Sequence, residues 1–417
     1  MHLPPSLRHR KFVLLWAGLF ISIAGSQMQY WSLLWHIREL TDQPIAVSGI
    51  GLARFIPILA FALIGGLFAD RYDRRKIMLI TQATMALVAL ALGLLTLSGQ
   101  IRLGWIYLLT AVQAVAISFD LPARQSLISN LVPRDDLASA FSMSSIAADL
   151  GAIIGPGLSG LTIAALGLFS VYMINAVSFL AVIVALLMIG TVPQQAVKRA
   201  ENNHFRGRVD AGLFDIREGW RFILHQPVIM GSMILDFFAT FFSSANTLLP
   251  FITRDVLHAS VQQYGWLSAG QSIGAVSAAL VISQRSRMRR QGSLLLGAVV
   301  IFGLATVFFG LSHSFWLTLV ALILIGAGDS VSTILRNTIR QLQTPDELRG
   351  RMVSINQIFF QGGPQLGEVE SGIVAQAFGP AAAIVSGGVG CVLAVGLVGG
   401  RWPQLRAYDG VEEAANA

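Results

Sequence analysis

Twelve long apolar runs constrain the fold of this chain more than any other feature. Each is close to the roughly 20 residues that an α-helix needs to cross a lipid bilayer. They lie at Phe12–His36, Ile45–Ala69, Ile77–Leu97, Trp105–Leu127, Ala140–Ala165, Leu168–Val192, Val228–Phe251, Tyr264–Ile282, Leu294–Leu311, Phe315–Ile339, Met352–Phe378 and Ala381–Gly399. Runs of this length favour helices over the shorter, alternating strands of a membrane barrel. The sequence therefore predicts an all-α membrane protein with twelve transmembrane helices.

The composition excludes a large soluble helical protein. Only 12% of the 417 residues are charged and 54% are hydrophobic, whereas soluble domains carry about 25% charged residues. The single cysteine, Cys391, lies in the last run, so neither a disulfide framework nor a cysteine metal site is possible. The histidines at the edges of the runs, among them His36, are interpreted as interface residues, and no spacing indicates a metal site.

The positive charges indicate how the chain is oriented in the membrane. Of the 29 Lys and Arg residues, 22 fall on the N-terminus, the loops after even-numbered runs, or the C-terminal tail. Three fall on the opposite side, and four lie within or at the ends of runs. This bias is typical of cytoplasmic loops, and it predicts that both termini are cytoplasmic. A nucleic-acid-binding protein would gather its basic residues on one folded face instead, so no nucleic-acid partner is expected.

A polar stretch, Pro193–Asp210, divides the runs into two sets of six. We expect an N-terminal half at 1–192, a cytoplasmic linker at 193–225, a C-terminal half at 226–400 and a cytoplasmic tail at 401–417. Within the linker, Leu213–Leu224 fits either a helix lying in the membrane interface or an extension of the seventh span.

The two halves resemble each other at an offset of 212 residues. The matched pairs are Arg124 with Arg336, Pro133 with Pro345, Ser142 with Ser354, Gly155 with Gly367, and Gly160 with Gly372. Duplicated halves around a site near the membrane midplane are typical of secondary transporters. The copies differ after the second span of each half, because Ser283-Gln284-Arg285 stands opposite Asp70-Arg71 and the second half lacks the acid.

Two short motifs carry the most specific signals. After the second run the chain reads Gly66-Leu-Phe-Ala-Asp70-Arg71-Tyr-Asp73-Arg74-Arg75-Lys76. The fifth run contains Gly151-Ala-Ile-Ile-Gly155-Pro156-Gly157-Leu-Ser-Gly160. From its residue types alone, the second motif predicts a tightly packed and kinked helix face. Small residues allow close approach of another helix, and an interior proline removes a backbone hydrogen-bond donor.

These motifs resemble those of the major facilitator superfamily. The first is similar to its G-x-L-A-D-R-x-G-R-R/K loop, with Asp73 in place of the second glycine, and the second is similar to a signature found mainly in its exporters. Further segments, among them Gly51–Pro57, Phe119–Ser126 and Gln343–Met352, resemble the branch that contains the enterobactin exporters and related multidrug exporters. The resemblance runs from about residue 8 to 400 and implies two pseudo-symmetric six-helix halves. It also implies a gating charge network, for which the matching residues here are Gly66, Asp70, Arg71, Arg74, Asp120 and Arg124.

Polar residues recur at helical spacing inside four spans. The stripes are Ser22, Ser26 and Gln29 in span one; Gln113, Asp120 and Arg124 in span four; Asp236, Thr240, Ser243 and Thr247 in span seven; and Asp329, Thr333, Arg336 and Arg340 in span ten. Each stripe lies on one helix face, and the resemblance implies that the four faces share one cavity. Some of these residues also have a structural interpretation. Arg124 and Arg336 fit contact with lipid headgroups or pairing with acids of the loops, and Asp120 fits a network with Asp70 and Arg74.

Acids inside the spans are candidates for proton transfer. An ionised carboxylate is costly in a membrane span, so Asp236 and Asp329 are candidate titrating groups. Span eleven adds the stripe Gln357, Gln361, Gln365 and Glu368, with Glu370 turned away from it, and Arg54 of span two could pair with either acid. We expect a proton and substrate pathway formed by Gln29, Arg54, Gln113, Asp236, Asp329, Arg336, Gln361 and Glu368.

The resemblance implies a monomeric secondary transporter of the bacterial inner membrane, and not an enzyme. It would move a siderophore or drug-like small molecule outward by alternating access, with the proton gradient as its driving force and no cofactor. Two alternatives stay open: a proton-coupled uptake symporter of a small organic anion, and a lipid scramblase or membrane-embedded enzyme. A pump driven by ATP is disfavoured because the chain has no G-x-x-x-x-G-K-[ST] phosphate loop.

Overall fold

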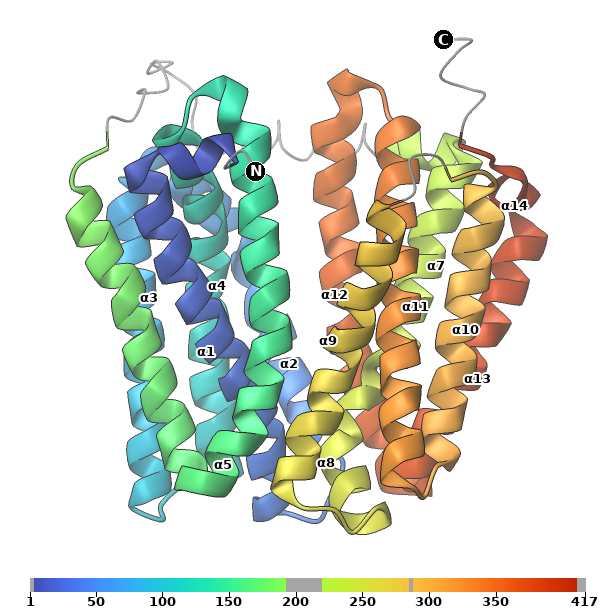
Figure 1. Ribbon diagram of the computed structural model, residues 1–417, viewed down its shortest axis with the longest axis horizontal. Coiled ribbons are helices and arrows are strands. Elements are labelled where there is room, and N and C mark those ends of the chain that lie inside the picture. Colours follow the sequence, from blue (N-terminus) through green and yellow to red (C-terminus); the bar gives the residue numbers. More distant parts are fainter. Residues whose placement is uncertain (1–3, 193–219, 285–287, 411–417) are drawn as a thin grey trace. The chain divides into compact units, whose positions relative to one another are not determined.

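The computed structural model describes residues 4–192, 220–284 and 288–410, and the regular structure within them is helical (Figure 1). The principal helices are α1 Arg10–Leu40, α2 Ala46–Arg71, α3 Arg74–Leu97, α4 Leu103–Leu131, α5 Leu137–Ile189, α7 Pro227–Ser243, α9 Val261–Ser283, α10 Gln291–Leu311, α11 Phe315–Leu342, α12 Asp346–Phe378 and α13 Pro380–Arg401. Gly167 adopts a left-handed φ of 79° and breaks α5 into two spans. Counted this way, the described part of the chain contains the twelve predicted spans, and eight of its helices are long and apolar enough to cross a membrane by themselves.

The chain forms two compact units. Unit 1 comprises Met1–Lys198 with Ala259–Ala269, and unit 2 comprises Arg199–His258 with Gly270–Ala417. Most of the linker expected at 193–225 lies outside the described residues, and only its last six residues are described, as helix. The offset found in the sequence recurs in the helices, since α4 begins at Leu103 and α11 begins 212 residues later, at Phe315.

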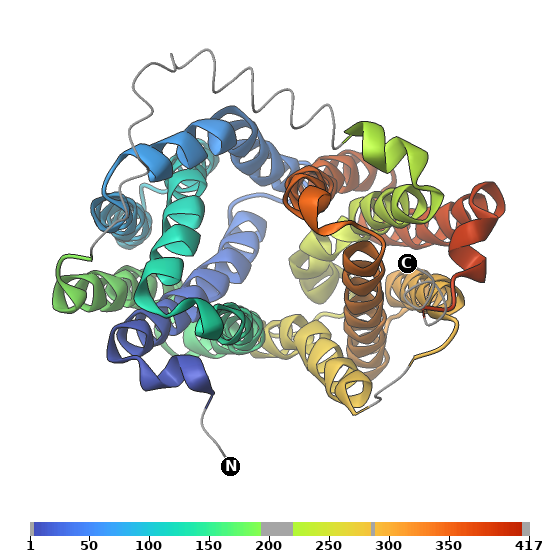
Figure 2. The ribbon, with the colours of Figure 1, turned by 90° about the horizontal axis from the view of Figure 1, so that it is seen from above.

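In unit 1, helix α1 lies between the two spans of α5. A Cβ atom added to Gly155 of α5 would lie 2.5 Å from the Cβ of Gln27 and 2.9 Å from the carbonyl oxygen of Ala24. On the other side, Gly18 of α1 lies directly against Ala181 of α5. In lipid the hydrophobic effect contributes little to the association of helices, so close packing through small residues holds them together instead. Figure 2 shows the helices of this unit from above.

Unit 2 repeats this arrangement with different residues. Helix α7 packs against both α12 and α13. Gly363 and Gly367 of α12, which correspond to Gly151 and Gly155 at the 212-residue offset, lie against Thr240 and Phe241 of α7. The internal repeat is therefore visible as the same pair of glycine contacts in each unit.

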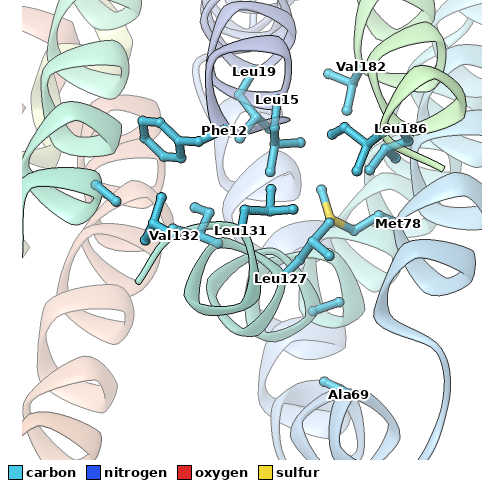
Figure 3. Close-up of a cluster of buried hydrophobic side chains, with 14 residues drawn as sticks. Phe12, Leu15, Leu19, Ala69, Met78, Leu127, Leu131, Val132, Val182 and Leu186 are labelled. Carbon is cyan, nitrogen blue, oxygen red and sulfur yellow. The ribbon is translucent and has the colours of Figure 1, made fainter. Parts of the chain in front are cut away.

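A cluster of buried apolar side chains surrounds one end of α1 in unit 1 (Figure 3). It joins Phe12 and Leu15 of α1 to Met78 of α3, Leu127 of α4 and Leu186 of α5. These five residues are at most 1% exposed. The cluster joins four helices near the loop that carries the first sequence motif, so it holds the surroundings of that loop in place.

Asp73, which replaces the glycine expected in the loop motif, has a structural role. It is the N-cap of α3, and its carboxylate accepts hydrogen bonds from the backbone N–H groups of Arg75 at 2.9 Å and Lys76 at 3.3 Å. A side-chain acceptor at this position satisfies backbone donors that have no partner within the helix. The carboxylate also offsets the three basic residues with which α3 begins, next to the positive end of its helix dipole.

Span seven departs from the regular helix predicted at Val228–Phe251. Helix α7 ends at Ser243, and the chain continues through a 3₁₀ turn at Ser244–Leu248, the short helix α8 at Leu249–Phe251 and a π turn at Ile252–Val256. Because these turns have other periods than an α-helix, Thr247 does not continue the polar stripe of Asp236 and Thr240. The prediction of one continuous four-residue stripe was wrong at this end.

Candidate functional site

Four charged side chains meet inside unit 2. Asp236 comes from α7, and Asp329, Arg336 and Arg340 come from α11. The steps of seven and four residues along α11 place its three members on one face of that helix. Helix α7 packs beside α11 and brings the fourth charge to this face, which the sequence spacing could not show.

Asp236 lies between the two arginines. Nη2 of Arg336 is 3.1 Å from Oδ1 of Asp236, and Nη2 of Arg340 is 3.0 Å from Oδ2. All three side chains are 2% exposed or less. Removing such charges from water costs several kcal/mol for each ion, so a buried pair persists only where attraction and hydrogen bonds offset that cost. Asp236 is the group that allows both arginines to be buried.

Arg340 is the most fully bonded member of the cluster. Its Nε donates to the hydroxyl of Ser232 at 3.2 Å, and its Nη2 donates to the carbonyl oxygen of the same residue at 3.0 Å. Its Nη1 donates to the side-chain oxygen of Asn356 on α12. Arg340 therefore ties three helices of unit 2 together, and its role is structural. The sequence analysis missed both Ser232 and Asn356.

Arg336 retains unused hydrogen-bonding capacity. Its Nη2 donates to Thr333 at 2.8 Å and lies 3.9 Å from Oδ1 of Asp329, whose side chain is 54% exposed. Within the described residues, Nη1 of Arg336 and the hydroxyl of Ser332 have no hydrogen-bond partner, although both atoms are buried. Since buried donors rarely stay unpaired, these atoms are candidates for contact with a polar substrate group or with water.

The cluster is balanced in charge, with two carboxylates and two guanidinium groups. Arg54, which was predicted to belong to the same pathway, lies in unit 1, with its guanidinium carbon 5.0 Å from the ring centre of Tyr30. The described contacts thus give no excess of positive charge at this place.

Unit 1 contains a second buried charge pair. Asp120 of α4 is 2% exposed, and its Oδ2 lies 3.1 Å from Nη2 of Arg124. Its Oδ1 accepts from Thr81 and Gln82 of α3, both at 2.9 Å. Among the described contacts, Asp120 is thus held by α3 and by Arg124, not by Arg74. The structure thus brings together Asp120 and Arg124, two residues of the expected network.

The basic residues of the loop motif bind backbone carbonyl groups instead. Arg74 donates to the carbonyl oxygens of Ala69 and Ser126, both at 3.3 Å, and Arg75 donates to that of Leu186 at 2.7 Å. Arg71 is exposed. The side chain of Asp70, for which a gating role was predicted, lies outside the described residues.

The predicted pathway residues of spans one and four form a chain of amides. Gln29 of α1 donates to Gln113 of α4 at 3.0 Å and accepts from Asn175 of α5 at 2.7 Å, and Asn175 in turn accepts from Ser178 at 2.9 Å. The structure thus brings Gln29 and Gln113 together, and with Asn175 they link three helices. Asn175 was missed, although an amide within an apolar run is a signal that could have found it.

The remaining predicted residues are distributed over other parts of the units. Glu368 of α12 is buried at 4% exposure, and the side chain of Gln361 lies outside the described residues. His36, interpreted as an interface residue, is instead buried and hydrogen-bonded through Nδ1 to the hydroxyl of Tyr172 at 2.8 Å. The interpretation of His36 was wrong because α1 extends to Leu40 and places this histidine against α5.

Among the described residues, twelve helical spans in two repeated units, with charged side chains buried inside them, define a multi-pass membrane transporter. The model of the transmembrane secretion effector family matches residues 3–416. The chain therefore belongs to this family, within the major facilitator superfamily, which confirms the resemblance seen in the sequence.

Two relatives and two solved structures agree with this assignment. The chain is 27% identical over 394 residues to the enterobactin exporter EntS of Citrobacter koseri, covering 94% of this chain and 91% of the relative. It is 28% identical over 348 residues to the EntS protein of Escherichia coli, covering 82% and 80%. The fold matches the nucleoside transporter NupG with a TM-score of 0.71 at 14% identity, covering 93% of this chain and 98% of NupG. It also matches a bacterial homologue of the lysosomal transporter Spinster with a TM-score of 0.69 at 15% identity, covering 97% of each chain.

Proposed function

We propose that this transporter exports a siderophore or another drug-like organic molecule across the bacterial inner membrane, in exchange for protons. Two relatives that match most of the chain are named as exporters of enterobactin, a siderophore. The observation that carries the proton part of the proposal is the charge cluster of unit 2, where an exposed acid, Asp329, shares Arg336 with the buried Asp236.

The cluster offers a way for a proton and a substrate to compete. An ionised Asp329 can accept a hydrogen bond from a hydroxyl group of the substrate, while the unpaired Nη1 of Arg336 and hydroxyl of Ser332 donate to an oxygen of the substrate. A proton on Asp329 weakens it as an acceptor, so proton uptake at this residue opposes binding of the substrate. A ligand shifts a conformational equilibrium only by its different affinity for the two states, and this competition supplies such a difference.

Transport direction and coupling can be measured together in everted membrane vesicles. These vesicles are energised by respiration, which makes their interior acidic, and they are supplied with radiolabelled enterobactin. An exporter that exchanges protons accumulates the label inside, and a protonophore abolishes the accumulation. Accumulation only in right-side-out vesicles would identify an uptake symporter. Conversion of the label into a new product would identify a membrane enzyme.

The variant Asp329→Asn tests the role given to the exposed acid. It is expected to abolish proton-driven accumulation and to leave counterflow, which needs no gradient, within about twofold of the wild type, because Asp236 still holds Arg336. The matched control is Asp135→Asn, which removes an exposed carboxylate from the connection between α4 and α5. Proton-driven accumulation at the wild-type rate in Asp329→Asn would rule out this residue as the coupling group.

A further inference from the structure

The segment after α13 is packed against the beginning of α10. It contains the short helix α14, Pro403–Ala407, which lies at the same end of unit 2 as the start of α10 (Figure 1). Leu405 is fully buried, and together with Trp402 it lies against Gly231 of α7. The segment Trp402–Gly410, which we call the C-terminal strap, is thus part of the packed structure of unit 2.

Hydrogen bonds join the strap to the first residues of α10. The backbone N–H of Gly292 donates to the carbonyl oxygen of Tyr408 at 3.0 Å, and the hydroxyl of Ser293 donates to that of Arg406 at 3.0 Å. A side chain at position 292 has no room, because its Cβ would collide with the carbonyl oxygen of Leu405. The approach is therefore close along the whole first turn of α10.

Asp409 adds a charged contact to this junction. Its Oδ1 accepts a hydrogen bond from the backbone N–H of Arg290, and its Oδ2 lies 3.6 Å from Nε of Arg289. Arg290 is the N-cap residue of α10, and its own side chain forms no capping hydrogen bond. The beginning of α10 thus carries two arginines at the positive end of a helix dipole, where an acid is favourable and a cation is not.

In the first unit, an acid adjacent in the sequence balances the basic residues at the start of a helix. Helix α3 also begins with basic residues, and Asp73, directly before them, caps the helix. The corresponding loop of the second unit has no acid before α10. Asp409 occupies this role from a position 119 residues further along the chain.

We propose that Asp409 is a positioning residue that caps α10 from the C-terminal strap and replaces the acid missing from the loop of the second unit. The strap is accordingly a functional part of the transporter. Through Asp409 it determines where α10 begins and how Arg289 and Arg290 are held.

Hydrogen–deuterium exchange of the protein in detergent tests the capping directly. The variant Asp409→Ala removes the acceptor and is expected to speed exchange in the peptide that contains Arg290 and Gly292 by about five- to tenfold, which corresponds to about 1–1.4 kcal/mol for a lost cap. Asp409→Asn keeps an acceptor that caps helices well and is expected to stay within about twofold of the wild type. The matched control, Asp135→Ala, should leave this peptide unchanged.

Two results would overturn the proposal. Unchanged exchange in Asp409→Ala would show that the carboxylate does not hold the start of α10. Equal acceleration in the alanine and asparagine variants would show that only its charge matters, and not its capping bond.

Enterobactin transport in everted vesicles provides a second readout, and this arm rests on the proposed function. Asp409→Ala is expected to lower the maximal rate with the half-saturating concentration unchanged, and Asp409→Asn is expected to restore the rate. A changed half-saturating concentration with an unchanged maximal rate would contradict a positioning role. If the wild type does not transport enterobactin, the proposed function fails, whereas the exchange experiment still decides the role of Asp409.

Discussion

The variant Asp236→Ala is expected to lose about 3–5 kcal/mol of unfolding free energy, because it leaves two buried guanidinium groups without a counter-charge. Arg336 and Arg340 are each 2% exposed and both pair with this one carboxylate. Reversible unfolding of the purified protein in mixed detergent micelles measures the loss.

Two comparisons show whether the uncompensated charge is the cause. Asp329→Ala removes an acid that is 54% exposed and 3.9 Å from Arg336, and it is expected to cost less than about 1 kcal/mol. Adding Arg340→Met to Asp236→Ala removes one of the two unpaired buried charges and should recover part of the lost unfolding free energy. If Asp236→Ala unfolds with the same free energy as the wild type, the cluster does not stabilise unit 2.

The variant Gly155→Ala is expected to destabilise the protein by about 1–3 kcal/mol, the usual cost of overpacking. The new Cβ atom would lie 2.9 Å from the carbonyl oxygen of Ala24 and from the backbone nitrogen of Met28. Backbone atoms of α1 cannot turn away as a side chain can, so α1 and α5 must separate. The same unfolding measurement in mixed micelles applies.

The chain provides a matched control two residues away. A Cβ atom at Gly157 would lie 3.7 Å from the Cβ of Ala269, which is an ordinary contact. Gly157→Ala is therefore expected to be neutral or slightly stabilising, since alanine favours a helix over glycine. Equal stability of the two variants would show that the close approach of α5 to α1 is not needed.

The repeat relates the prediction for Gly155 to the second unit. Gly367, at the 212-residue offset, lies against the backbone of Phe241 in α7 as Gly155 lies against α1. In the amino-acid sequence these two glycines match only by their offset. The helix against which each glycine packs could not be predicted from the sequence, because a small residue allows close approach but does not select the helix that approaches.

The residues of the candidate site could be predicted in part. The spacing of Asp329, Arg336 and Arg340 correctly placed them on one face of α11. It could not reveal that Asp236 pairs with both arginines, because helical periodicity relates only residues of the same helix. For the same reason the hydrogen bonds of Asp120 with Thr81 and Gln82 of the neighbouring helix could not be predicted.

The amino-acid sequence by itself determined that this chain is a membrane protein of twelve helices in two repeated halves. Burial in lipid is decided by composition and length alone, since every helix must satisfy its own backbone. The tertiary structure alone decided which charges neutralise each other, which helix each glycine faces, and that Asp409 caps α10. Each of these contacts joins residues that are far apart in the chain, and only the packing of one helix against another brings them within hydrogen-bonding distance.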